Sequence, residues 1–344
     1  MMTRLKHLCS LEGVSGREDA VRRYILQELA ASPAPMTVSV DPLGNVIARV
    51  EGKKRASSTL LFAAHMDEVG FIITGVTDEG YLRFSPVGSV DSSVIFGKRV
   101  KVNEHFGVIG GKAVHQCKDD EKKTAVAIDK LLIDVAADSR EEAQNIARPG
   151  DMAVFDSDFA SLGGGLFKAR ALDDRAGCAL LLEFVNDTPE YDIVLAFTVQ
   201  EEVGLRGAKT AAYGVAPDIA VVVDSTTAAD TAGVDADKQV CRVGKGPVVS
   251  FMDNRTLYDK SLYDRVFRTA EQIGIPVQTK SMVAGGNDAG AIQLSRTGVR
   301  VAAVSLPCRY IHSPSCVLSE NDLKTASELL QALVGEFAGG EESD

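Results

Sequence analysis

The sequence has no run of apolar residues long enough to cross a membrane. A spanning helix needs about 20 such residues in succession, and no stretch of the 344-residue chain approaches that length. The polar residues 1–6 also lack the apolar core of a signal peptide. We therefore expect a cytoplasmic protein with no membrane partner.

Other missing features each remove a class of function. The six cysteines include no CxxC pair, so we expect neither a disulfide framework nor a thiolate zinc site. A Gly-rich phosphate loop is absent, and the three glycines at residues 163–165 are better interpreted as a flexible joint. The net charge of −11 disfavours nucleic acid as a partner.

The pattern of apolar residues divides the chain into two kinds of segment. A hydrophobic content of 45% and a charged content of 25% are typical of a soluble globular protein. Longer apolar runs and amphipathic helices occur in residues 1–67 and 166–338, whereas residues 68–165 contain short strand-like segments between Gly, Pro and Asp. We predict an α/β domain in two pieces, a β-rich domain inserted between them, and a disordered tail at residues 339–344.

Local signals place the main elements of the α/β part. Ser15 and Glu18 have the spacing of a capping box for a helix to about residue 31, and Ser319 is expected to cap a final helix to about residue 337. Hairpins are predicted at residues 36–50 and 239–252. Buried strands are predicted at residues 58–64, 192–199, 219–223 and 299–306, with further helices from about residues 172 and 258.

Polar side chains gather where these apolar segments end. Ligands of open α/β sheets bind beyond the carboxyl ends of the strands, so side chains at these positions are candidates for a site. Two imidazoles with several carboxylates and no thiolate suit zinc, cobalt or manganese, and such a set can hold two metals roughly 3.5 to 4 Å apart. The candidates are His65, Asp67, Asp173, Asp174, Glu201, Glu202, Asp224 and His312.

Taken singly, each candidate has a simpler explanation. Glu201 and Glu202 could open the next helix, where acidic side chains suit the positive end of the dipole. Asp173 or Asp174 could cap a helix, Asp224 could form an Asx turn, and a histidine at a strand end is often only hydrogen-bonded. Their common position at one edge of the predicted sheet favours a metal site.

Five stretches carry these candidates in a recognisable order. They are Ala-His-Met-Asp-Glu-Val-Gly at residues 64–70, Ala-Leu-Asp-Asp-Arg-Ala-Gly at 171–177, Gln-Glu-Glu-Val-Gly-Leu-Arg-Gly-Ala at 200–208, Asp224, and Tyr-Ile-His-Ser-Pro at 310–314. This order resembles that of metallopeptidase family 42, which includes the glutamyl aminopeptidases and the TET deblocking aminopeptidases. The resemblance covers essentially the whole chain. It implies an α/β fold in which a mixed-sheet, dinuclear-metal aminopeptidase domain flanked by helices carries an inserted small β-barrel of PDZ-like type.

The resemblance also implies roles for the residues. His65 and Asp224 would be terminal metal ligands, Asp173 would bridge two divalent ions, and Glu202 and His312 would complete the site. Glu201 would act as general base, and Asp67 would orient the imidazole of His65. The ions would be zinc or cobalt, with manganese as a further possibility. The substrates would be short peptides with a free N-terminus, and the chain would form a homo-oligomer, from a dimer up to a hollow dodecamer.

Two other functions stay open on the residues alone. One is a two-metal deacylase or glycan-directed hydrolase, although glycoside hydrolysis needs only a carboxylate pair and this set includes two histidines. The other is a non-catalytic metal-binding assembly protein, which would be expected to have lost Glu201 while keeping the metal ligands. The presence of Glu201 disfavours the second alternative.

Overall fold

The computed structural model describes residues 1–119 and 121–339. The predicted disordered tail lies outside the described residues from residue 340 onward. Within them, no helix is both long and apolar enough to cross a bilayer.

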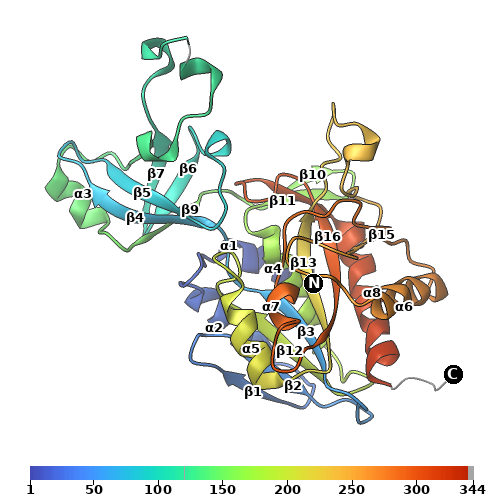
Figure 1. Cartoon of the computed structure of the whole chain (residues 1–344). Coiled ribbons are helices and arrows are strands. Elements are labelled where there is room, and N and C mark those ends of the chain that lie inside the picture. The colour runs from blue at the N-terminus through green and yellow to red at the C-terminus, as the bar shows by residue number, and fades with distance from the viewer. Residues whose placement is uncertain (120, 340–344) are drawn as a thin grey trace.

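An eight-stranded mixed sheet forms the centre of the larger part of the molecule (Figure 1). Its four middle strands run parallel, and antiparallel neighbours flank them on both sides. These parallel strands are buried on both faces, which explains their nearly continuous apolar sequences. In spatial order the strands are β1 (Met36–Val40), β2 (Val46–Val50), β12 (Ile193–Thr198), β3 (Leu60–His65), β13 (Ile219–Thr227), β16 (Arg300–Cys308), β14 (Val248–Val249) and β15 (Gln278–Thr279).

Helices cover both faces of this sheet. Alternate residues of a strand face opposite sides, so Phe62 packs in one core while Leu61 and Ala63 pack in the other. The larger core is covered by α1 (Met2–Ser10), α2 (Asp19–Ala30), α4 (Leu172–Glu183), α6 (Lys260–Gln272) and α8 (Glu320–Ala338). The smaller core lies under α5 (Arg206–Val215) and α7 (Ala289–Ile292).

A closed six-stranded barrel lies to one side of this α/β body (Figure 1). It has a core of its own, in which the ring of Phe71 makes edge-on contacts with the rings of Phe84 and Phe155. Its strands, in spatial order, are β4 (Gly70–Val76), β5 (Leu82–Val87), β8 (Leu132–Asp134), β7 (His105–Gly110), β6 (Arg99–Val102) and β9 (Met152–Phe155), and the helix α3 (Arg140–Ile146) accompanies them. The predicted boundaries of the inserted domain, residues 68 and 165, stay a prediction.

A small antiparallel sheet follows the barrel in the chain. It consists of β10 (Ala160–Gly163), β11 (Leu166–Ala169) and β17 (Cys316–Ser319). Gly163, Gly164 and Gly165 have positive φ and form the turn between β10 and β11, so the three glycines serve a tight connection.

Two local predictions are wrong. Ser15 and Glu18 do not form a capping box, because helix α2 begins at Asp19 without a side-chain cap and both side chains bond elsewhere. The hairpin predicted at residues 239–252 is absent, since β14 is only two residues long and pairs with β15 and β16 instead. The hairpin of β1 and β2 and the cap of α8 by Ser319 are both confirmed.

Candidate metal centre

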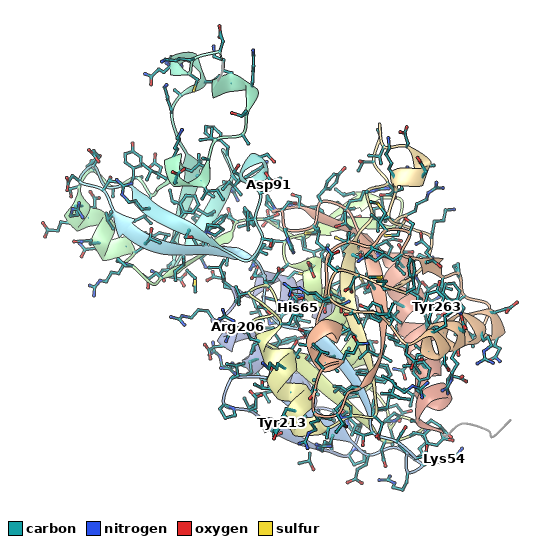
Figure 2. All side chains as sticks on the ribbon, in the orientation of Figure 1. Lys54, His65, Asp91, Arg206, Tyr213 and Tyr263 are labelled. Carbon is teal, nitrogen blue, oxygen red and sulfur yellow. The ribbon has the colours of Figure 1, made fainter. Side chains whose placement is uncertain are left out.

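The candidate side chains converge at the carboxyl edge of the parallel strands. His65 is the last residue of β3, and Figure 2 shows it on the side of the α/β body that faces the barrel. Asp224 lies on the neighbouring strand β13, which continues past the predicted end to Thr227. The start of α4, where the backbone of Asp173 is not helical, and the loops after β12 and β16 supply the others, namely Asp173, Glu201, Glu202 and His312.

Asp173 connects two groups of potential metal ligands. Its Oδ1 lies 3.2 Å from Nε2 of His65, and its Oδ2 lies 3.2 Å from Nε2 of His312. Asp224 completes one group with His65, and Glu202 completes the other with His312. Within each group, ligand atoms lie within 4.8 Å of one another. One carboxylate thus offers one oxygen to each of two adjacent three-residue sites.

Both imidazoles are held so that Nε2 faces the carboxylates. Nδ1 of His65 donates to the backbone carbonyl of Asp67 at 3.1 Å, and Nδ1 of His312 donates to the carbonyl of Ser89 at 2.8 Å. These bonds fix the tautomer in which Nε2 carries the lone pair, as a metal ligand requires. Ser89 follows strand β5, so the barrel segment supplies one of the two orienting carbonyls.

The carboxylate of Asp67 fixes the loop that carries the two glutamates. It accepts the backbone N–H groups of Glu201 at 2.9 Å and of Glu202 at 3.1 Å, and the hydroxyl of Ser15 at 2.6 Å. Its Oδ1 is also 3.4 Å from Nδ1 of His65. Asp67 therefore contacts His65, the residue that it is predicted to orient. It makes more hydrogen bonds to the backbone of Glu201 and Glu202, which the sequence did not indicate.

The segment before helix α2 contacts the loops of the candidate centre, and the sequence analysis misassigned it. Glu18 accepts the backbone N–H of Gln200 at 3.1 Å, directly before Glu201. Together with the bond from Ser15 to Asp67, this ties the segment to both loops of the centre. The spacing of Ser15 and Glu18 was the available signal, but neither side chain caps helix α2, since Ser15 donates to the carboxylate of Asp67 and Glu18 accepts backbone N–H groups outside the helix.

The electrostatics of the cluster follow from burial and close opposite charges. Burial alone lowers the pKa of His65, but hydrogen bonds with Asp173 and Asp67 raise it well above its usual value. Burial raises the pKa of Asp173, yet hydrogen bonds with the two imidazoles lower it below the usual range. Burial and repulsion from Asp173 raise the pKa of Asp224 well above normal. Burial likewise raises the pKa of Glu201. The two imidazoles therefore do not balance the charge of all the carboxylates, and a divalent cation would supply the missing positive charge.

The donor set fits divalent metal ions. Two imidazoles and three carboxylates without a thiolate suit borderline and hard cations. Glu202 Oε1 is buried and has no hydrogen-bond partner among the described residues, so it has a lone pair for a cation. Glu201 and Glu202 do not open a helix, because α5 begins only at Arg206. This excludes the alternative in which Glu201 and Glu202 are only the acidic first residues of a helix.

A cavity of about 650 Å³ opens over the cluster. His65, Asp173, Glu201, Glu202, Asp224 and His312 all line it. Asn254, Arg255 and Lys280 also line it. A small ligand in this cavity would touch Glu201 and both groups of candidate metal ligands.

Comparison with known proteins places this architecture among peptidases. A putative aminopeptidase of Acetivibrio thermocellus is 38% identical over 332 residues, covering 96% of this chain and 97% of that relative. A solved aminopeptidase from the archaeon Desulfurococcus kamchatkensis is 36% identical with a TM-score of 0.91, covering 97% of this chain and 94% of the other. The TET1 peptidase of Pyrococcus horikoshii, which can assemble into a tetrahedron or a large octahedral shell, is 37% identical with a TM-score of 0.84, covering 96% of this chain and 98% of the other.

Fold, ligand cluster and matches together define a metal-dependent aminopeptidase, a hydrolase acting on peptide bonds. The chain belongs to the M42 glutamyl aminopeptidase family, whose model matches residues 44–329. The family and the fold class predicted from the sequence are both confirmed.

Proposed function

We propose that the chain is a two-metal aminopeptidase that removes N-terminal residues from short peptides with a free N-terminus. The observation that carries the proposal is the position of Asp173, whose two oxygens each lie 3.2 Å from a different imidazole. A single carboxylate shared by two complete three-ligand groups is the arrangement that a pair of adjacent ions needs.

In this proposal Asp173 would be shared by the two sites. His65 and Asp224 would hold one ion, and Glu202 and His312 would hold the other. Such ions, for which zinc, cobalt and manganese are the candidates, would supply polarisation of the scissile carbonyl and would lower the pKa of a water molecule toward neutral pH.

Glu201 is the general base of the proposal. It belongs to neither ligand group, yet it lines the same cavity. Its backbone is held by Asp67, so its carboxylate stays beside the ligands while remaining free to move protons. Glu201 takes a proton from the attacking water and later returns it to the leaving amine. The two adjacent glutamates thus have different roles, because the carboxylate of Glu202 would bind metal.

The alternative functions are not favoured. The family model and the Acetivibrio thermocellus relative are both named for aminopeptidases, which disfavours a deacylase or a glycan-directed hydrolase. A non-catalytic binding protein has no need of an acid outside the ligand set, whereas Glu201 lies in the cavity beside both groups.

We also propose that residues 68–165 form an oligomerisation domain attached to a catalytic domain of residues 1–67 and 166–338. The barrel has a separate hydrophobic core, and the TET1 relative can assemble into a tetrahedron or a large octahedral shell, which supports assembly of this chain into a dimer or a larger homo-oligomer such as a dodecamer. A cytoplasmic location stays a prediction from the sequence.

The test is hydrolysis of aminoacyl p-nitroanilides bearing Glu, Asp, Leu, Ala or Lys by metal-stripped protein, before and after adding zinc, cobalt or manganese. Metal should restore cleavage. Glu201→Gln should lower kcat about 10²- to 10⁴-fold with its metal content retained, as expected for loss of a general base. Glu202→Ala should instead lose metal. Glu104→Gln, on the exposed barrel surface, is the matched control. Near-normal turnover by Glu201→Gln would refute its role.

A further inference from the structure

A second cleft opens beside the metal-centre cavity. It has a volume of about 960 Å³ and lies along helix α5 and the segment from α7 to Arg296. The two cavities share four lining residues, which are Gly204, Leu205, Asn254 and Arg255. The two cavities therefore adjoin each other at this shared wall. No step of the mechanism proposed above uses this space.

Apolar and cationic side chains both line the cleft. Tyr213 and Leu294 line it and are 63% and 79% exposed, so the cleft offers apolar surface to a ligand. Its charged lining residues are Lys209, Arg255 and Arg296, with no Asp or Glu among them, although the chain carries a net charge of −11. The cleft is therefore locally positive on an acidic protein.

Two of these cations are available for an external anion. The ammonium of Lys209 and the guanidinium of Arg255 make no hydrogen bond or ion pair with any residue that the structure describes. The Nε of Arg296 donates to the carbonyl of Tyr213, and its guanidinium lies 4.5 Å over that ring, which leaves its remaining N–H groups free to face the cleft. The hydroxyl of Ser295, another lining residue, is buried and unpartnered among the described residues.

The spacing along α5 sets the length of a suitable ligand. Lys209 and Tyr213 are four residues apart on α5, so they lie on one face of the helix, and Leu205 directly precedes its first residue. Figure 2 shows Tyr213 on the part of the body away from the barrel, whereas His65 is on the side facing it. From Arg206 to Tyr213 the helix advances about 11 Å, and an extended peptide covers about 3.3 Å per residue. Three to four residues beyond the shared wall therefore span the cleft.

We propose that this cleft binds the C-terminal part of short peptide substrates, with their terminal carboxylate received by Lys209, Arg255 and Arg296. The inference rests on the proposed aminopeptidase function, because it extends the same peptide past the metal centre. An extended peptide presents apolar side chains to Tyr213 and Leu294. Its terminal carboxylate supplies a negative charge for the cationic lining residues, among which there is no Asp or Glu. The enzyme then selects peptides of about four or five residues with a free C-terminus.

The experiment compares kcat/KM for free-acid and C-terminally amidated peptides of the form X-Ala, X-Ala-Ala, X-Ala-Ala-Ala and X-(Ala)₅, where X is the residue preferred in the p-nitroanilide panel. The wild-type acid-to-amide ratio should be largest for the tetrapeptide, at about tenfold, and should shrink with added salt. Lys209→Met should lower that ratio about threefold, and Lys209→Met with Arg296→Met should bring it close to one. Lys324→Met, on α8, is the matched control and should leave the ratio unchanged.

The outcomes separate this inference from the proposed function. Metal-restored cleavage of the p-nitroanilides and peptides with an acid-to-amide ratio near one at every length would overturn the inference alone. An unchanged ratio in Lys209→Met, which loses no internal bond, would do the same. A variant that alters the oligomeric mass in light scattering but not the ratio would identify the cleft as an interface between copies. No cleavage of any substrate would refute the function itself.

Discussion

A buried ion-pair cluster behind the metal centre carries our most direct prediction on stability. Glu68 is 3% exposed and lies between two arginines, Arg170 at 5% and Arg175 at 0%. Its Oε1 accepts Nη2 of Arg175 at 3.2 Å and the backbone N–H of Gly13 at 3.1 Å, and its Oε2 accepts Nη1 of Arg170. Glu68 is thus the anion between two otherwise uncompensated buried cations.

Replacing Glu68 by Ala should cost about 3 to 5 kcal/mol in the free energy of unfolding, because removing one partner leaves buried charge unpaired. The arginines keep carbonyl acceptors, among them Leu11 O for both, so the loss falls on charge compensation rather than on hydrogen bonding alone. Glu68→Gln keeps an acceptor for Gly13 and should cost less. A domain is commonly stable by only 5 to 15 kcal/mol, so the alanine variant loses a large fraction of its stability.

The assay is equilibrium denaturation of metal-stripped protein, since bound metal would add its own stabilisation. Because barrel and α/β body can unfold separately, the transition should be followed by circular dichroism and by tyrosine fluorescence, the chain having no tryptophan. Glu104→Ala, at a site that is 92% exposed, provides the control. If the free energy of unfolding of Glu68→Ala lay within about 1 kcal/mol of the wild-type value, the stabilising role inferred from the burial of the cluster would be refuted.

Two further predictions concern the metal centre. Burial lowers the pKa of His312, but hydrogen bonds with Asp173 and Glu202 outweigh it and raise that pKa from 6.5 to about 11. The contribution of His312 to the stability of metal-free protein should therefore be complete below pH 6.5 and should be lost as the pH rises toward 11. Metal affinity should rise across the same window with proton release, measured by calorimetry in buffers of different ionisation enthalpy; uptake without proton release would contradict this. Gly88 has a φ of +81°, and an added Cβ would lie 2.8 Å from Val69 Cγ1 and 3.3 Å from Glu202 Cβ. Gly88→Ala should therefore lower metal content and kcat. Gly97→Ala, also at positive φ but with open space around it, should lower neither. Equal metal content in the two variants would count against the contact.

The sequence was sufficient to predict which candidate ligands lie together, because chemistry and strand pattern coincide there. His65 ends a buried parallel strand and Asp224 lies on the next, so the rule that sites form beyond the carboxyl ends of such strands brought them together in advance. Their types then limited the cofactor to a divalent metal. The hairpin of β1 and β2 and the cap of α8 were also predictable, because each depends on residues adjacent in the chain.

Sequence analysis failed where a side chain chooses a distant partner over a local one. Ser15 and Glu18 have the spacing of a capping box, but the carboxylate of Asp67 and the N–H of Gln200 take their hydrogen bonds. Local periodicity carries no information on such competition. The cationic cleft was hidden for the same reason, since Lys209, Arg255 and Arg296 come from three separate segments and each resembles an ordinary surface residue.

The barrel contributes to the metal centre through its backbone, which no residue pattern could reveal. The sequence assigned this segment to assembly alone, yet the carbonyl of Ser89 accepts Nδ1–H of His312 and fixes the tautomer that leaves Nε2 toward Asp173 and Glu202. A carbonyl is common to every residue, so only the position of the barrel makes this one specific. That position is itself constrained, because β4 begins five residues after His65 and Gly88 packs closely against Val69 and Glu202. The segment proposed to join copies of the chain therefore also orients a candidate metal ligand, which explains why a barrel with its own core lies so close to the centre.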